Sequence, residues 1–174
     1  SAIRISRGHL SLYQLTIEPG TEFYKKRVKA TNEDIGAELY ELTQEIMDNA
    51  GLPAYEISNH AKKGQESRHN LIYWRGGDYL GIGPGAHGRI THAYKTEMMH
   101  NYREPEIWLN LAITKKYGQQ KRAALSKEER RNELVLMGLR LTEGISLDHF
   151  NSLTNQHLTK IIDKNRIKTL TDQG

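Results

Sequence analysis

The feature that most constrains the fold is a run of apolar residues at helical spacing between residues 31 and 50. The run begins with Thr31 and Asp34 in the arrangement of a helix cap, and Gly51 and Pro53 follow its end. Its recurring apolar residues are Ile35, Leu39, Leu42, Ile46 and Ala50. This spacing predicts a long amphipathic helix.

Segments with the character of strands flank this helix. Apolar residues alternate with polar and aromatic ones over residues 9–17, and a Glu-Pro-Gly-Thr turn follows at 18–21. A short apolar segment, 52–57, comes after the helix, and the polar stretch 58–68 is predicted to be a loop. Strand, helix and strand in this order predict a βαβ unit, and so an α/β fold built on a parallel sheet.

The second half of the chain alternates short elements. Residues 79–82 are predicted as a short strand, and 89–94 also have strand character. Glu104-Pro105 opens a helix, a basic linker follows at 118–124, and Ser126 and Glu129 form a capping-box pattern for a helix reaching about Leu141. Two more short helices are predicted at 146–150 and 158–167. We therefore expect two domains, residues 1–118 and a small helical accessory domain at 119–174, for which a winged form is an option.

Composition limits the classes of function. The chain has 174 residues, of which 37% are hydrophobic, and it contains no cysteine, so it cannot ligate an iron–sulfur cluster by itself. Its 25 basic and 21 acidic residues give a mild net charge of +4, which argues against nucleic acid as the main partner. A basic stretch between residues 115 and 131 keeps a nucleic-acid or protein-binding module as an alternative. The sequence shows neither a membrane span nor a signal peptide, so we expect a cytoplasmic protein.

Residues 69–74 are the first candidate site. His69 and Tyr73 are four positions apart, which places them on one face of a helix or of a strand. Asn70 and Trp74 are related in the same way. An imidazole can ligate haem iron, and large aromatic rings suit a flat tetrapyrrole. The alternative is a hydrogen-bonded histidine that serves packing.

A glycine-rich segment forms the second candidate site. Residues 83–88 match the pattern G-x-G-x-x-G, but strand-like residues follow where a nucleotide-binding loop would start a helix. We therefore predict a tight loop at the end of a strand, where the backbone of Gly83 and Gly85 approaches a ligand. His87 either exchanges a proton there or stabilises the turn.

Arginines flank both candidate sites. The guanidinium groups of Arg68, Arg75 and Arg89 could pair with carboxylates such as porphyrin propionates, or could simply be solvated at the surface. The remaining histidines show no spacing typical of metal ligands, so no protein metal site is predicted.

Three segments, residues 9–21, 52–60 and 67–88, resemble the oxygen-independent coproporphyrinogen III oxidase-like radical-SAM proteins. Within that family, the pattern H-N-x-x-Y-W at residues 69–74 resembles the signature of the haem-chaperone branch. The resemblance is strong from about residue 9 to 141 and weaker through the helical tail.

The resemblance implies a partial (β/α)6 barrel with S-adenosylmethionine and a [4Fe–4S] cluster held by a C-x-x-x-C-x-x-C motif. That motif is missing from this sequence. The chain is therefore expected to be a C-terminal fragment, α+β by itself, containing the last strands and helices of the barrel and the helical domain. By the same resemblance, His69 becomes the candidate haem ligand, with Asn70, Tyr73, Trp74 and Arg75 around the porphyrin. Leu15 and Thr16 become contacts at the edge of S-adenosylmethionine.

The function implied is haem or porphyrin handling, with haem binding and delivery as the first hypothesis. The alternative within the family is the oxidase itself, in which a 5′-deoxyadenosyl radical starts the oxidative decarboxylation of propionates. No catalytic residue is assigned in the chain, which is expected to be inactive alone. Its expected partners are haem or porphyrin, the missing N-terminal half of the barrel, and a second copy of the chain bound through an exposed barrel edge.

Overall fold

The computed structural model describes residues 2–173, and the chain divides into two compact units, with the boundary in the sequence between Arg68 and His69. The predicted partition at residues 118 and 119 is a different division of the chain, and it stays a prediction. Each unit mixes helices with an antiparallel three-stranded sheet, so the predicted mixed α/β class is confirmed.

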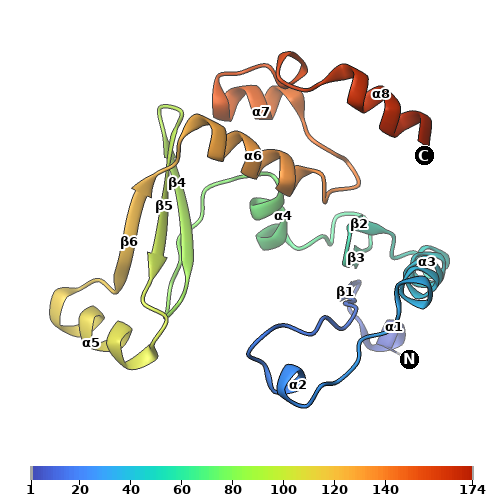
Figure 1. Ribbon diagram of the computed structural model, residues 1–174, viewed down its shortest axis with the longest axis horizontal. Coiled ribbons are helices and arrows are strands. Elements are labelled where there is room, and N and C mark those ends of the chain that lie inside the picture. The colour runs from blue at the N-terminus through green and yellow to red at the C-terminus, as the bar shows by residue number, and fades with distance from the viewer. Residues whose placement is uncertain (1, 174) are drawn as a thin grey trace. The chain divides into compact units, whose positions relative to one another are not determined.

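The first unit contains three strands and three helices (Figure 1). The elements are α1 (Ala2–Ile5), β1 (His9–Ser11), α2 (Glu22–Lys25), α3 (Glu33–Asn49), β2 (Ala54–Glu56) and β3 (Asn59–Ala61). The predicted amphipathic helix is confirmed as α3, although Asn32 rather than Thr31 caps it, through a hydrogen bond of 2.8 Å from the Ile35 amide to Asn32 Oδ1.

The predicted parallel sheet is wrong, because every strand pair in the described residues is antiparallel. β1 and β2 run in the same direction, but β3 lies between them and pairs antiparallel with both. Residues 59–61, predicted as loop, form this middle strand because the chain turns back directly after β2, which closes a much shorter loop than a helical crossover does. The predicted strand 9–17 ends at Ser11, since β3 has only three residues with which it can pair.

The second unit contains α4 (Arg68–Trp74), whose first residue belongs to the first unit, followed by an antiparallel meander. The meander consists of β4 (His87–His92), β5 (Lys95–Asn101) and β6 (Gln119–Ala124), with α5 (Pro105–Lys115) between β5 and β6 (Figure 1). The predicted linker 118–124 is thus a strand. The predicted strand 79–82 reduces to one bridge between Tyr79 and Arg89.

The helical tail comprises α6 (Lys127–Gly138), α7 (Leu147–Thr154), a 3-10 turn η1 (Leu158–Lys160) and α8 (Lys164–Gln173). The predicted capping box is confirmed: the Glu129 amide donates to Ser126 Oγ at 3.1 Å, and the Ser126 amide donates to Glu129 Oε2 at 2.8 Å. Leu134, Phe150 and Leu158 form the buried core of this tail. The single helix predicted at 158–167 is replaced by η1 and α8.

Candidate functional site

Residues 69–74 lie on α4, so the helical alternative for this segment holds. One helical turn brings His69 and Tyr73 together: His69 Nε2 and Tyr73 Oη are 2.9 Å apart, and the rings meet edge to face with centroids separated by 4.7 Å. The His69 side chain is exposed and Tyr73 is half-buried. The arrangement presents an imidazole to solvent and holds its orientation through a half-buried tyrosine.

Tyr73 also contacts a second aromatic residue, Tyr79. Its ring packs edge to face on that of Tyr79, with centroids 4.4 Å apart. Burial raises the pKa of the Tyr79 phenol, although Arg89 partly opposes the shift. The rings of His69, Tyr73 and Tyr79 therefore form a continuous aromatic row from the surface of α4 toward β4.

Trp74 lies at the end of α4, with the Arg140 guanidinium 4.4 Å above the centre of its ring. Its indole Nε1 is buried and has no hydrogen-bond acceptor among residues 2–173. Asn70 is half-buried one turn earlier. The helix thus separates an exposed His69 from a Trp74 that is held against the helical tail.

Two of the three arginines predicted to receive carboxylates, Arg75 and Arg89, are paired with glutamates. Arg75 Nε and Nη2 donate to the two carboxylate oxygens of Glu143 at 2.8 and 3.1 Å, and this contact lowers the pKa of Glu143. Arg89 Nε donates to Glu133 Oε1 at 2.9 Å. Arg68 is exposed. A ligand carboxylate would have to displace a glutamate to reach Arg75.

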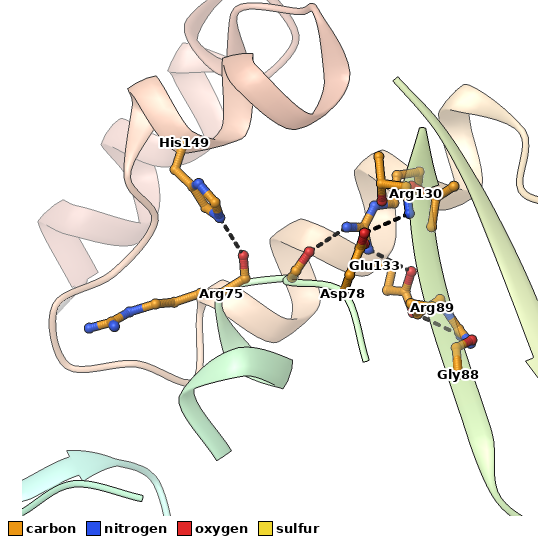
Figure 2. A network of polar contacts seen from close by, with 10 residues as sticks. Arg75, Asp78, Gly88, Arg89, Arg130, Glu133 and His149 are labelled. Carbon is orange, nitrogen blue, oxygen red and sulfur yellow. Dashed lines mark hydrogen bonds and ion pairs between the residues drawn. The ribbon is translucent and has the colours of Figure 1, made fainter. Parts of the chain in front are cut away.

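Several residues of this region were not identified from the sequence. Arg130 belongs to the basic stretch between residues 115 and 131, but it is buried: Nη2 donates to the Gly76 carbonyl at 2.5 Å and Nη1 to Glu133 Oε2 at 3.2 Å. His149 Nε2 lies 2.9 Å from the Arg75 carbonyl oxygen. Figure 2 shows these contacts as one polar network, which fixes the segment after α4 to α6, α7 and β4. The spacing of three between Arg130 and Glu133 was the available signal, because it pairs residues on one helix face.

The glycine-rich loop has a backbone conformation that favours glycine at two positions. Gly83 and Gly85 have positive φ angles of 100° and 69°, and Asn101 Nδ2 donates to the Gly83 carbonyl at 2.9 Å. The segment leads into β4 rather than a helix, as predicted from the residues that follow it.

His87 begins β4 and is exposed. Its ring stacks on that of His100, with centroids 4.4 Å apart. The pKa of His87 is lowered by partial burial and by the nearby charges of His100, Arg89 and Arg103. His87 and the His69 row are both in the second unit, but among the described residues no ring contact joins His87 to the row.

The residues predicted to touch S-adenosylmethionine, Leu15 and Thr16, are exposed and follow β1 in the first unit. Among residues 2–173 no group of three or more histidine, cysteine, aspartate or glutamate side chains could hold a metal ion. The chain has no cysteine, so its own residues do not fit the thiolate ligation of an iron–sulfur cluster. Within the described residues, no helix is both long and apolar enough to cross a bilayer.

Comparison with known proteins agrees with the sequence resemblance. Residues 125–174 match the HemN C-terminal domain family. The chain is 38% identical over 156 residues to the mitochondrial radical S-adenosyl methionine domain-containing protein 1 of Mus musculus, covering 85% of the chain and 35% of that protein. It is 33% identical over 178 residues to the heme chaperone HemW of Bacillus subtilis, covering 100% of the chain and 46% of HemW. This chain belongs to the HemN-like radical S-adenosylmethionine family.

The fold agrees with this assignment. The solved structure of coproporphyrinogen III oxidase (HemN) from Escherichia coli, a radical SAM enzyme, matches with a TM-score of 0.65 at 12% identity, covering 89% of this chain and 38% of HemN. The chain therefore spans less than half the length of these HemN-like relatives.

Proposed function

We propose that this HemN-like chain is part of a protein that binds haem and delivers it to an acceptor, with His69 as the ligand to iron. The observation that carries the proposal is the exposed imidazole of His69, oriented at 2.9 Å by the half-buried Tyr73. Histidines that bind metals are commonly oriented by a hydrogen bond on the ring nitrogen that does not bind the metal. With Nε2 held by Tyr73, Nδ1 is the nitrogen that would face iron.

Exposure of His69 supports delivery rather than permanent storage. A protein that passes haem to another must let the macrocycle leave, and a surface ligand allows this more readily than an enclosed pocket. The printed name of the Bacillus subtilis relative, a heme chaperone, supports the same role. The cytoplasmic location expected from the sequence remains part of the proposal, and some relatives are named mitochondrial.

A haem titration followed by Soret absorbance tests this proposal. We expect the wild-type chain to bind haem stoichiometrically and His69→Ala to lose the shift of the Soret band. His92→Ala is the matched control, because His92 is also an exposed histidine of the second unit and lies at the end of β4. Equal spectra for His69→Ala and wild type would exclude His69 as the ligand.

The role of Tyr73 gives a second measurement on the same site. Tyr73→Phe keeps the ring contact with Tyr79 and removes only the hydroxyl that holds His69. Loss of a group that orients a metal ligand typically weakens metal binding by about 10-fold or more. We expect Tyr73→Phe to retain a Soret shift with an affinity about 10-fold lower than wild type. An unchanged affinity would show that the hydrogen bond to Tyr73 has no part in binding.

A further inference from the structure

A cavity of about 230 Å³ lies between α4, β4 and α6, beside the aromatic row that starts at His69. This is far more than the volume of about 10–15 Å³ that a single water needs. Its polar and aromatic lining comprises Tyr73, Trp74, Tyr79, Arg89, Arg130 and Glu133. Figure 2 shows Arg89, Arg130 and Glu133 gathered between β4 and α6. The cavity is therefore large enough for a small organic group, and charged side chains lie on a wall that is otherwise mostly apolar.

Two of the lining residues carry buried N–H donors without an acceptor among residues 2–173: Trp74 at Nε1 and Arg130 at Nε. Arg130 is 4% exposed, and its two terminal nitrogens are occupied by Gly76 and Glu133. Buried donors are nearly always paired in native proteins, since an unpaired one loses its hydrogen bond to water without replacement. Both donors belong to residues that line this one cavity, and we infer that an acceptor bound in the cavity is their partner.

The charged residues that line the cavity indicate that this acceptor is negatively charged. Arg89 and Arg130 each contribute a positive charge, and both pair with the single carboxylate of Glu133. The lining therefore carries one positive charge in excess. A carboxylate would neutralise this charge, and its two oxygens accept hydrogen bonds without donating any.

We propose that this cavity binds a carboxylate group, with Trp74 Nε1 and Arg130 Nε as its donors. Tyr73 belongs both to the cavity and to the contact with His69, so the group bound there lies next to the proposed iron ligand. The carboxylate is then a propionate group of haem. This assignment of the carboxylate to haem rests on the proposed haem function. The glutamate partners of Arg75 and Arg89 would stay in place, because the two donors used here are unoccupied.

Titration with sodium propionate, followed by the indole N–H resonances of the chain, tests the carboxylate site without haem. The sequence has two tryptophans, Trp74 and Trp108, and Trp74→Phe assigns the two signals. We expect a saturable shift for Trp74 and none for Trp108, which lines a different cavity. Propionamide, a neutral molecule of the same shape, should produce no saturable shift. If Trp74→Phe does not fold, the Nε–H resonance of Arg130 in the wild-type chain gives the same readout without a substitution.

Comparison of haem with haem dimethyl ester identifies the source of the carboxylate. If the site holds a haem propionate, the ester should bind about 10-fold more weakly, since it loses a hydrogen-bonded charge. Saturable propionate shifts with equal affinities for haem and ester would support a carboxylate site that takes a free acid. Absence of any saturable shift with propionate would overturn the proposal and leave a cavity filled by water. The Soret titration of His69→Ala uses neither propionate nor haem dimethyl ester. It can therefore show failure of the proposed haem function independently of the carboxylate site.

Discussion

His60 on β3 is a buried titratable residue whose side chain is 1% exposed. Its Nδ1 has no hydrogen-bond partner among the described residues. Burial lowers the pKa of His60, and a hydrogen bond to the Leu52 backbone only partly opposes this shift. The folded first unit therefore holds His60 as a neutral imidazole, whereas an unfolded chain takes up a proton near the usual value of about 6.5.

This difference predicts a loss of stability in acid. Because the folded pKa lies below the unfolded one, the unfolded state binds more protons as the pH falls below about 6.5, and the free energy of unfolding decreases. We expect His60→Leu to remove part of this decrease between pH 7 and pH 5, as measured by urea unfolding. His157→Gln, a change at an exposed histidine, should leave the pH dependence unchanged. A pKa of His60 at or above 6.5 by NMR titration would contradict the prediction.

Individual contacts also show which parts of the candidate site could be predicted from the sequence. The offset of four between His69 and Tyr73 was readable because it places both on one face whichever element forms. The pairing of Arg75 with Glu143, 68 positions away, and of Arg130 with the Gly76 carbonyl, 54 away, was not readable. Such contacts depend on how α4 packs against the helical tail. The spacing of residues within one segment cannot predict this packing. The role of His69 itself stays a prediction.

At the scale of elements, local signals predicted helices better than strands. The helix caps and the 3.6-residue periodicity identified α3 and α6, because both are set by residues within one or two turns. β6 was missed, since Gln119 to Arg122 lack the β-branched and aromatic residues typical of strands. It forms through pairing with β5, where Arg122 Nε donates to Glu97 at 3.0 Å across the sheet. Tertiary context therefore determines this strand.

The capping box at the start of α6 gives a prediction at this scale. Ser126→Ala removes the acceptor for the Glu129 amide and should lower the free energy of unfolding by about 1 kcal/mol. Ser152→Ala is a control inside α7, where the hydroxyl donates to the His149 carbonyl of the preceding turn. Thermal or urea unfolding of the two variants measures the difference. Equal stability of Ser126→Ala and wild type would mean that the cap contributes nothing.

At the scale of the whole molecule, the βαβ prediction was right in the order of its elements and wrong in their pairing. Strand, helix and strand follow each other as expected, but the chain inserts β3 between β1 and β2. A short hairpin of this kind leaves little trace in hydrophobic periodicity, because residues 59–61 are polar or small yet buried. The α3 helix belongs to the same unit. Its apolar pattern predicted that a helix forms there, but not how the apolar face packs.

The apolar stripe of α3 is largely exposed, although its periodicity predicts burial. Ile35, Leu39, Leu42 and Ile46 are 47–50% exposed, and Met47 is the buried residue of the helix. A continuous apolar surface of this kind is uncommon on soluble monomers and favours association. We therefore expect the 174-residue chain to self-associate with rising concentration, as measured by sedimentation equilibrium.

Substitution on the stripe separates this surface from other causes of association. Leu39→Glu places a charge in the middle of the apolar stripe and should shift the population toward monomer, because a buried unpaired carboxylate opposes contact. Glu41→Gln, on the exposed polar side of the same helix, removes a charge without adding apolar surface and should leave the association unchanged. A wild-type chain that stays monomeric at every concentration would show that the stripe is tolerated in water. Equal association of wild type and Leu39→Glu would instead place the contact on another surface, for which the exposed edge of β1 or β2 is the next candidate.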